Sequence, residues 1–299
     1  MRAFLFPGQG SQYVGMADAI PDRSEALSLF ARASEILRMD LWKLVQSGEE
    51  EVLVRTENAQ PALFVTEMAW FYALARRGVM CDMAAGHSLG EFTALCAANV
   101  FSFEDGVSLV RRRGEIMANA VSKTPGSMVA LVGMNIDDVN TVLGAAQSAG
   151  IVEIANFNAP DQAVLSGEES AMQRVIVEAS ALGHGRVIKL RVGAPFHSSL
   201  MAQGSVEFET ALRAVPFSDP RFPVVNNVAG VIETAPGRIK ENLVLQFRSP
   251  VQWIQTMKTF EDMGSNQYLE VGPRTVLSAL ARKANSRNTV QAVEAGSWG

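Results

Sequence analysis

The sequence is poor in several features that would place a protein in a special class. It holds two cysteines, Cys81 and Cys96, in 299 residues, and both lie in apolar stretches. Two such thiols exclude a disulfide framework and a cysteine-based metal site, and they indicate a reduced, cytoplasmic protein. Residues 1–10 lack the layout of a signal peptide. No uncharged apolar run approaches the ~20 residues that a membrane helix needs; the stretch 61–74 is broken by Glu67. We therefore expect no membrane partner.

Positive charge is scarce as well. The chain has 26 lysines and arginines against 31 aspartates and glutamates, which gives a formal net charge of −5. This balance argues against nucleic acid as the main partner. Hydrophobic residues make up 48% of the chain and charged residues 19%, so an ordered protein with a sizeable core is predicted.

Helical and strand patterns alternate along the chain. Residues 127–192 stand apart because they follow the order β-α-β-β-α-β, which is the ferredoxin-like pattern. We therefore predict an α/β fold in which one large domain, formed by residues 1–125 and 196–299, is interrupted by a small ferredoxin-like subdomain at 126–195. In the large domain, strands are predicted at 3–6, 224–228 and 267–271, and helices at 24–37, 49–54, 62–77, 91–99 and 103–121.

The stretch Gly86-His87-Ser88-Leu89-Gly90-Glu91 has the form of a nucleophile elbow, with a short apolar run before it and a helical pattern after it. A serine on such a strand-to-helix turn projects its hydroxyl where a substrate carbonyl can reach it. Side chains larger than those of Gly86 and Gly90 would crowd the neighbouring strand and helix. The backbone N–H of Leu89, at the helix start, is then placed to stabilise an oxyanion.

An activated serine needs a base, and the chain offers three histidines. His87 adjoins the nucleophile and is expected to pack or hydrogen-bond structurally, while forming part of the substrate-binding wall. His184 lies between two glycines and is expected in a surface turn. His197 lies where the chain leaves the small subdomain, and clefts form at such junctions. We therefore predict that His197 is the base of Ser88.

A catalytic triad would add an acid that orients the imidazole. No acidic residue is marked for this role, because Glu270 and Asp262 both fit ordinary positions at a strand end and in a helix. A backbone carbonyl that accepts a hydrogen bond from Nδ1 would hold the same tautomer. The residue pattern leaves these two possibilities open.

Five motifs in one order carry a resemblance to a known family. They are Phe6-Pro7-Gly8-Gln9-Gly10-Ser11-Gln12, the elbow at 86–91, Leu109-Val110 followed by Arg113-Gly114, Pro195-Phe196-His197-Ser198-Ser199-Leu200-Met201, and Ser249-Pro250-Val251-Gln252-Trp253. Together, from residue 4 to about residue 285, the chain resembles the malonyl-CoA:acyl-carrier-protein transacylases and the acyltransferases of polyketide synthases. This resemblance implies an α/β-hydrolase-like core with an inserted ferredoxin-like subdomain.

The resemblance also implies roles for individual residues. Ser88 would accept the acyl group and His197 would act as its base. The backbone N–H groups of Gln9 and Leu89 would form the oxyanion hole. A main-chain carbonyl before the proline of the last motif orients the histidine in this family, which would make Ser249 the orienting residue and explain the missing acid.

Arg113 would bind the free carboxylate of a malonyl group. Independent support comes from its position at the edge of the apolar face that Val110 and Met117 share, where a guanidinium needs an anionic partner. The alternative is a structural ion pair with an acidic residue at the edge of the core. Phe196, directly before the base, is bulky and favours malonyl over methylmalonyl groups, and His87 is assigned to the same substrate site.

The expected activity is ping-pong transfer of a malonyl group from malonyl-CoA, through an acyl-serine, to the phosphopantetheine thiol of acyl-carrier protein. No cofactor is expected, and the protein is expected to be a monomer in either fatty-acid or polyketide synthesis.

A trans-acting polyketide acyltransferase would use the same chemistry. An editing hydrolase would tend to lack the carboxylate-binding Arg113, and a scaffold without activity would have lost Ser88 or His197. An ordinary esterase would place its histidine near the C-terminus.

Overall fold

The computed structural model describes residues 1–123 and 125–296. Residues 124 and 297–299, which the predicted large domain includes, lie outside the described residues. The strands are β1 (Arg2–Phe6), β2 (Met83–Gly86), β3 (Gly126–Val132), β4 (Val152–Ala159), β5 (Gln162–Glu168), β6 (Arg186–Lys189), β7 (Val224–Val225), β8 (Gln267–Glu270) and β9 (Thr289–Ala292). The helices are α1 (Arg23–Leu37), α2 (Leu41–Ser47), α3 (Glu50–Leu53), α4 (Thr56–Arg76), α5 (Leu89–Ala97), α6 (Phe103–Lys123), α7 (Ile136–Ala146), α8 (Glu169–Ala181), α9 (Ala202–Ala214), α10 (Pro236–Gln246), α11 (Trp253–Asp262) and α12 (Val276–Ala284).

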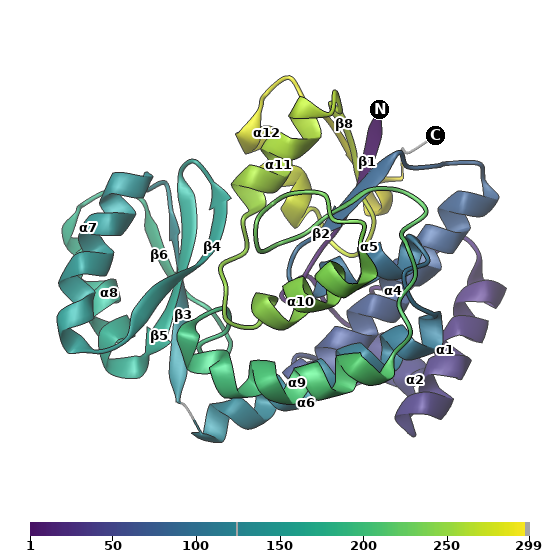
Figure 1. Ribbon diagram of the computed structural model, residues 1–299, viewed down its shortest axis with the longest axis horizontal. Coiled ribbons are helices and arrows are strands. Elements are labelled where there is room, and N and C mark those ends of the chain that lie inside the picture. The colour runs from purple at the N-terminus through teal and green to yellow at the C-terminus, as the bar shows by residue number, and fades with distance from the viewer. Residues whose placement is uncertain (124, 297–299) are drawn as a thin grey trace.

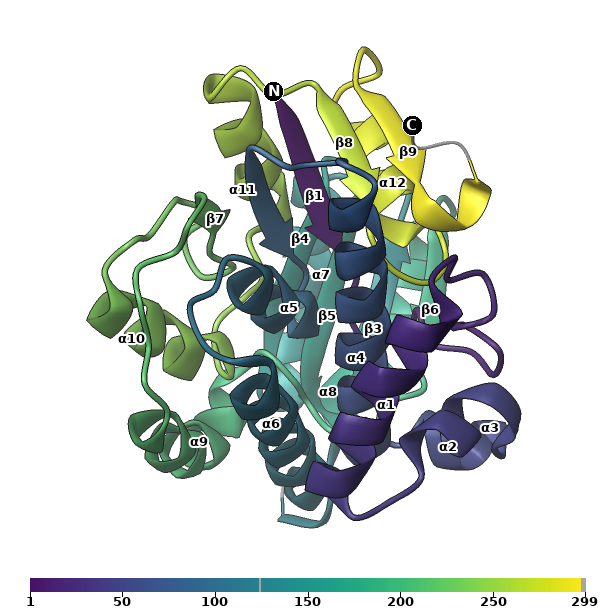
Figure 2. The same cartoon turned by 90° about the vertical axis from the view of Figure 1, so that its right-hand side faces the viewer.

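The larger sheet is parallel and covered on both faces. Its five strands follow the order β7-β2-β1-β8-β9, and every neighbouring pair is parallel. Alternate residues of β1 enter two different cores: Phe4 and Phe6 pack among α1, α4, α5 and α6, whereas Ala3 and Leu5 pack against α11 and α12. Figures 1 and 2 show the sheet between these two groups of helices. Parallel sheets are stable when both faces are buried in this way.

The smaller sheet is antiparallel, with the order β4-β5-β3-β6. Val129 and Leu131 of β3 pack against α7 and α8, which lie on the outer side of this sheet at the left of Figure 1. Met128 and Ala130, the alternate residues, join the core of the larger part. The α/β fold class with a ferredoxin-like insertion is confirmed, while the exact boundaries at 125/126 and 195/196 stay predictions.

The sequence pattern missed or misplaced several elements. It predicted neither α2 nor the edge strand β9, because both are short. The last strand of the predicted ferredoxin-like unit, which was expected to reach residue 192, ends instead at Lys189, and the residues after it line the cavity described below. Strand β4, predicted to end at residue 156, runs on to Ala159 because Phe157 and Ala159 pair with β5. Across the chain, Phe157 also donates its N–H to the carbonyl of Val251, at 3.0 Å, and Val251 donates to Ala155, at 2.9 Å. The contacts with Val251 leave no local signal in the sequence.

The same contacts fix the small subdomain to the larger part. Besides the pairing of β4 with Val251, the Glu153 carboxylate accepts hydrogen bonds from both the N–H and the Oγ of Ser199, at 2.7 Å each. Lys283 on α12 forms an ion pair with Asp161, between β4 and β5, at 2.9 Å. The cleft between the two sheets is therefore braced at both ends of β4.

No helix among residues 1–123 and 125–296 is long and apolar enough to cross a membrane. Cys96 is buried and Cys81 half-buried, and both are free thiols. Burial raises the pKa of Cys81 to about 12, so this thiol is held in its unreactive protonated form.

A buried carboxyl group lies within α4. Glu67 is completely buried, its Oε2 accepts a hydrogen bond from Thr93 Oγ1 at 2.5 Å, and its Oε1 has no partner in the described chain. Burial, opposed by the Thr93 hydrogen bond, raises the pKa of Glu67 well above its usual value of 4.5. The folded protein therefore holds the proton of this carboxyl to higher pH than the unfolded chain does.

Replacing Glu67 therefore changes the pH dependence of stability. Above about pH 4.5 the unfolded chain releases this proton before the folded chain does, so rising pH costs up to about 1.4 kcal/mol per pH unit until the folded pKa is reached. Glu67→Gln removes this cost, and its advantage in free energy of unfolding over the wild type should grow as the pH rises above about 4.5. Urea unfolding of both chains at several pH values measures it. A pH-independent difference would show that Glu67 is ionised in the folded state.

Candidate active site

The turn at Ser88 exists because two glycines let backbone segments touch. A Cβ on Gly86 would lie 1.8 Å from the carbonyl carbon of Gly90, and a Cβ on Gly90 would lie 2.0 Å from the carbonyl oxygen of Phe6. Ser88 itself has φ 53° and ψ −101°, a conformation that side-chain-bearing residues rarely adopt. The predicted elbow is therefore present, with Ser88 directly before α5.

Asn227 holds this strained turn in place. Its Oδ1 accepts a hydrogen bond from the Ser88 N–H at 2.6 Å, and its Nδ2 donates to the Gly86 carbonyl at 2.7 Å. Its own N–H donates to Glu91 Oε2 at 3.2 Å. Sequence reasoning missed Asn227, although it lies just beyond the carboxyl end of β7, the edge of an open sheet where functional groups gather.

Ser88 and His197 form a hydrogen-bonded pair. The Ser88 Oγ and the His197 Nε2 are 2.8 Å apart, although 109 positions separate the two residues. His197 also has a positive φ, of 59°. Strain at two adjoining residues of one site is typical of functional geometry that the surrounding fold enforces.

The imidazole is oriented by a carbonyl, and the residue differs from the expectation. His197 Nδ1 lies 2.8 Å from the carbonyl oxygen of Gln246, and the Ser249 backbone raises the pKa of His197 less than the Gln246 backbone does. The assignment to Ser249 is therefore corrected to Gln246. The Gln246 carbonyl, the last of α10, is available because its helical donor would be the N–H of residue 250. That residue is Pro250, which has no N–H, so the carbonyl remains open to the imidazole.

Neither acid considered from the sequence contacts the histidine. Glu270 accepts hydrogen bonds from the N–H groups of Leu277 and Ser278, at 2.8 and 2.7 Å, and thus caps the start of α12. Asp262 is the last residue of α11. Of the two possibilities left open, a carbonyl rather than an acid is the observed partner.

Arg113 is buried beside the nucleophile. Its Nη2 donates to Ser88 Oγ at 3.0 Å and to Gln246 Oε1 at 2.8 Å, and its Nη1 donates to Gln60 Oε1 at 2.8 Å. The guanidinium also lies over the ring of Phe92, with 5.4 Å to the ring centre. A helix face thus carries a cation directly into the site, as the apolar stripe of α6 predicted.

No carboxylate in the described chain lies within ion-pair distance of Arg113, and its Nε–H has no partner there. The structural ion pair considered above is therefore not formed. Burial lowers the pKa of Arg113 to about 9, opposed by the charge of Glu91. Because a buried cation without a direct counter-ion is costly, this guanidinium is suited to receive an anion from outside.

Gln246 connects the whole site. While its carbonyl binds His197, its side-chain Nε2 donates to the Ser88 carbonyl at 3.0 Å and to Glu91 Oε2 at 2.6 Å, and its Oε1 faces Arg113. It is completely buried. Sequence reasoning missed Gln246 and Glu91, although the proline four residues after Gln246 signals an open carbonyl and Glu91 lies within the elbow motif.

The charge state of His197 follows from its surroundings. Burial first, and the positive charge of Arg113 second, lower the pKa of His197 to about 3, against the opposing effect of the Gln246 carbonyl. The imidazole is therefore neutral at neutral pH, which leaves Nε2 able to accept the proton of Ser88.

A cavity of about 370 Å³ opens above this pair, between the two sheets. Ser88, His197 and Arg113 line it together with Met117 of α6, Met128 of β3 and Phe196, which is 6% exposed. Its walls thus combine apolar side chains from both parts of the chain with one buried cation. The predicted position at a domain junction agrees with this geometry.

Gln9, Leu89 and His87 lie at the same cavity or border it. The side chain of Gln9 donates to Thr56 Oγ1 at 3.0 Å, and the backbone N–H groups of Gln9 and Leu89 have no acceptor among the described residues. His87 bonds through Nε2 to Asn158 Oδ1 of β4 at 2.9 Å, and burial lowers the pKa of its imidazole. His87 thus joins the elbow to the small subdomain.

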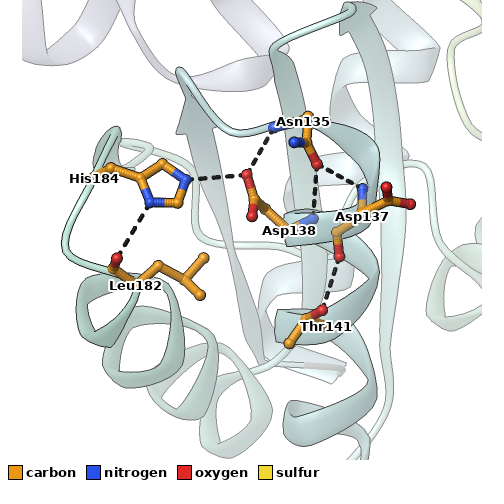
Figure 3. Close-up of polar contacts among 6 residues, drawn as sticks. All are labelled: Asn135, Asp137, Asp138, Thr141, Leu182 and His184. Atoms are coloured by element: carbon orange, nitrogen blue, oxygen red, sulfur yellow. Dashed lines mark hydrogen bonds and ion pairs between the residues drawn. The ribbon is translucent and has the colours of Figure 1, made fainter.

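His184 lies away from the site, in the turn before β6. Figure 3 shows its Nε2 facing Asp138 at 3.0 Å and its Nδ1 facing the Leu182 carbonyl at 3.2 Å. Asp138 in turn belongs to the cap that Asn135 forms at the start of α7. The hydrogen bond to Asp138 raises the pKa of His184, which is a surface ion-pair partner as its sequence setting suggested.

Comparison with known proteins identifies the family of this chain. The acyl transferase domain model matches residues 3–298. This chain belongs to the acyl transferase family. The resemblance drawn from the five motifs is thereby confirmed.

The relatives of this acyl transferase share its length and shape. It is 40% identical over 285 residues to the malonyl CoA-acyl carrier protein transacylase of Staphylococcus aureus (strain MW2), covering 95% of this chain and 92% of the relative. It is 39% identical over 287 residues to that of Bacillus subtilis (strain 168), covering 95% and 90%. The solved malonyl-CoA:acyl carrier protein transacylase of Xanthomonas oryzae pv. oryzae matches with a TM-score of 0.94 at 37% identity, covering 98% of this chain and 94% of that one. A malonyl-transacylase solved in complex with a type II polyketide synthase acyl-carrier protein matches with a TM-score of 0.92 at 36% identity, covering 97% and 94%.

The contacts of Asn227 predict how an alanine there would behave. Asn227→Ala leaves the Ser88 N–H and the Gly86 carbonyl without their partners, which should lower the free energy of unfolding by about 1–3 kcal/mol. Because the turn loses its clamp, acylation of Ser88 should slow by more than the loss of folded protein explains. Urea unfolding and single-turnover acylation, followed by intact mass, measure the two effects.

Asn226→Ala is the matched control. Asn226 is buried and directly precedes Asn227, but its side chain bonds to the backbone of Val231 and Ala229 rather than to the elbow. It should lose stability without a specific loss of acylation rate. Equal behaviour of the two variants would contradict the clamp.

Proposed function

We propose that this acyl transferase moves a malonyl group from malonyl-CoA to the phosphopantetheine thiol of acyl-carrier protein. The observation that carries the proposal is Arg113, a buried guanidinium with no direct carboxylate partner in the described chain, which reaches the oxygen of Ser88. A planar guanidinium matches a carboxylate, and malonyl differs from acetyl by that one group. The printed activity of the relatives points the same way.

In the first half-reaction, His197 Nε2 takes the proton of Ser88 as the oxygen attacks the thioester carbonyl. The negative charge on the tetrahedral carbonyl oxygen would be stabilised by the N–H groups of Gln9 and Leu89. Collapse of this intermediate breaks the carbon–sulfur bond, and the departing coenzyme A sulfur takes the proton from His197. The products are malonyl-Ser88 and free coenzyme A.

The second half-reaction runs the same steps with a different thiol. The phosphopantetheine thiol gives its proton to His197, and its sulfur attacks the carbonyl of malonyl-Ser88. When the carbon–oxygen bond breaks, Ser88 recovers the proton from His197. The steps use only the side chains and backbone N–H groups of the protein, malonyl-CoA and the carrier thiol, so the proposal includes no cofactor.

Arg113 links substrate choice to the strength of the base. Its charge is one reason why the pKa of His197 is depressed. A malonyl carboxylate on Arg113 offsets that charge and so makes His197 a stronger base when the correct substrate is in place. The same contact positions the acyl group relative to Ser88.

Phe196 and His87 are proposed to shape the acyl site. Phe196 directly precedes the base and forms part of the cavity wall, where its ring limits room for a branch on the acyl chain. His87, fixed by Asn158, forms another part of that wall. Together they favour malonyl over methylmalonyl groups.

The proposed setting is a cytoplasmic monomer that meets an acidic carrier protein. Two free thiols agree with a reducing compartment. The exposed Arg191 and Arg274 lie at the cavity, where cations would meet an acidic partner or a phosphate. Fatty-acid and polyketide carriers present the same thiol, and the chemistry is the same for both.

Intact-mass measurement tests the proposal directly. Brief mixing with malonyl-CoA should add one malonyl group to the wild type and none to Ser88→Ala, because the hydroxyl is the acceptor. Addition of holo acyl-carrier protein should then move the group onto the carrier. An adduct that forms from acetyl-CoA and is lost to water without a carrier would instead identify an editing hydrolase.

Arg113→Met tests the substrate class, because it keeps the bulk of the side chain and removes the charge. We expect kcat/KM for acylation by malonyl-CoA to fall about 100-fold or more, while acylation by acetyl-CoA is retained. Arg112→Met is the matched control, since its guanidinium lies on the next residue and pairs with Glu207 at the surface at 2.5 Å. Equal losses for both acyl groups in Arg113→Met would refute carboxylate recognition by this residue.

A further inference from the structure

Glu91 carries a buried carboxyl group that is linked to Arg113 through one residue, Gln246. Glu91 is 2% exposed, and its Oε2 accepts hydrogen bonds from Gln246 Nε2 at 2.6 Å and from the Asn227 N–H at 3.2 Å. The opposite end of the Gln246 amide, Oε1, accepts from Arg113 Nη2 at 2.8 Å. Glu91, Gln246 and Arg113 thus form one chain of hydrogen bonds beneath Ser88.

The amide of Gln246 has a direction, and this direction decides whether Arg113 is held. With Oε1 toward Arg113 the contact joins a donor to an acceptor. With the amide turned over, Nε2 and Nη2 would face each other as two donors and the contact would be lost. The acceptors at the other end fix the choice: the neutral carbonyl of Ser88, at 3.0 Å, and the carboxylate of Glu91, whose hydrogen bond is charge-assisted and stronger.

An indirect counter-ion also solves an electrostatic problem. A carboxylate in direct contact with Arg113 would stabilise the buried guanidinium but would occupy the donors that the substrate needs. Glu91 acts on the charge of Arg113 without being an ion-pair partner, because Gln246 lies between them. The cation is thus supported without an ion pair inside the protein, so no such pair has to break before a substrate carboxylate binds.

We propose that Glu91 is a positioning residue that sets the selectivity for carboxylated acyl groups, by fixing the Gln246 amide so that Arg113 is held for the substrate. The inference rests on the proposed function, since it concerns the same substrate site.

The selectivity should therefore depend on the charge of Glu91. Two charged groups face it: Arg113 from α6, and Glu233, which lines a small cavity shared with Glu91 ahead of α10. Burial raises the pKa of Glu91 to about 7, against the hydrogen bonds from Gln246 and Asn227 and the charge of Arg113. As pH falls through this value Glu91 loses its charge, and the preference for malonyl over acetyl should weaken.

The experiment compares Ser88 acylation by malonyl-CoA and acetyl-CoA in the full-length chain, with rates taken from quenched samples by intact mass. In Glu91→Gln the ratio of the two rates should fall about tenfold or more, mainly through the malonyl rate. In the wild type the same ratio should fall between about pH 8 and about pH 6, and in Glu91→Gln it should be flat. The rates are taken at acyl-CoA concentrations well below saturation, where they report ionisation of His197 in the free enzyme, which is common to both substrates and cancels in the ratio.

Two further variants separate positioning from stability. Glu67→Gln is the matched control, because Glu67 is also a buried carboxyl bonded to α5, through Thr93, and lies outside the chain of bonds to Arg113. It should leave the ratio unchanged. Gln246→Leu should lower the ratio by itself, and adding Glu91→Gln to it should lower the ratio no further, because Glu91 acts through the amide.

A Glu91→Gln chain that folds and slows both substrates equally would overturn the inference. If that variant does not fold, the wild-type pH series and Gln246→Leu still decide: a ratio constant with pH and unaltered in Gln246→Leu overturns it. Failure of the wild type to form any malonyl adduct is a different result, because it would refute the proposed function rather than the role of Glu91.

Discussion

The active site depends on one backbone carbonyl that a helix cannot use. Helix α10 ends at Gln246, and the residue that would donate to its carbonyl is Pro250. The open oxygen lies 2.8 Å from His197 Nδ1 and sets the tautomer that points Nε2 at Ser88. Since the side chain of the same residue binds the Ser88 backbone and Arg113, one helix end positions His197, Ser88 and Arg113 together. A site built in this way needs no acid to orient its histidine.

Much of this could be predicted from the sequence, and the parts that could not share a physical reason. The elbow, His197 and Arg113 could be predicted because each has a local pattern in the sequence. These patterns are the turn glycines, a rare histidine at a domain junction, and an arginine beside an apolar stripe. The fold class followed from the alternation of helices and strands in the same way. Asn227 was missed because its contacts cross the chain, and the orienting carbonyl was misassigned because any backbone carbonyl has the same chemistry. Proline rules narrow that choice, since they show which carbonyl lacks a helical partner.

Strain and restraint are paired throughout the site. Ser88 and His197 both have positive φ values, of 53° and 59°, at a cost of order 1–3 kcal/mol each. The Asn227 side chain bonds to both sides of the serine turn, and the Gln246 carbonyl binds the imidazole. The strained residues therefore present the reactive atoms, and hydrogen bonds from Asn227 and Gln246, on other elements, hold them in this conformation. This division explains why the amide residues of the site are as buried as its hydrophobic core.

The electrostatics of the site follow from the burial of one cation, Arg113. A guanidinium in that position lowers the pKa of His197 and would weaken the base if nothing offset its charge. Glu91 offsets part of it at one remove, and a carboxylated substrate would offset more by direct contact. Glu91 supports the cation while the site is empty, and under the proposed function a substrate carboxylate would add a direct counter-ion. Under that proposal a substrate without a carboxylate leaves Arg113 without a direct counter-ion and His197 a weaker base, so that selection and activation would rest on the same interaction.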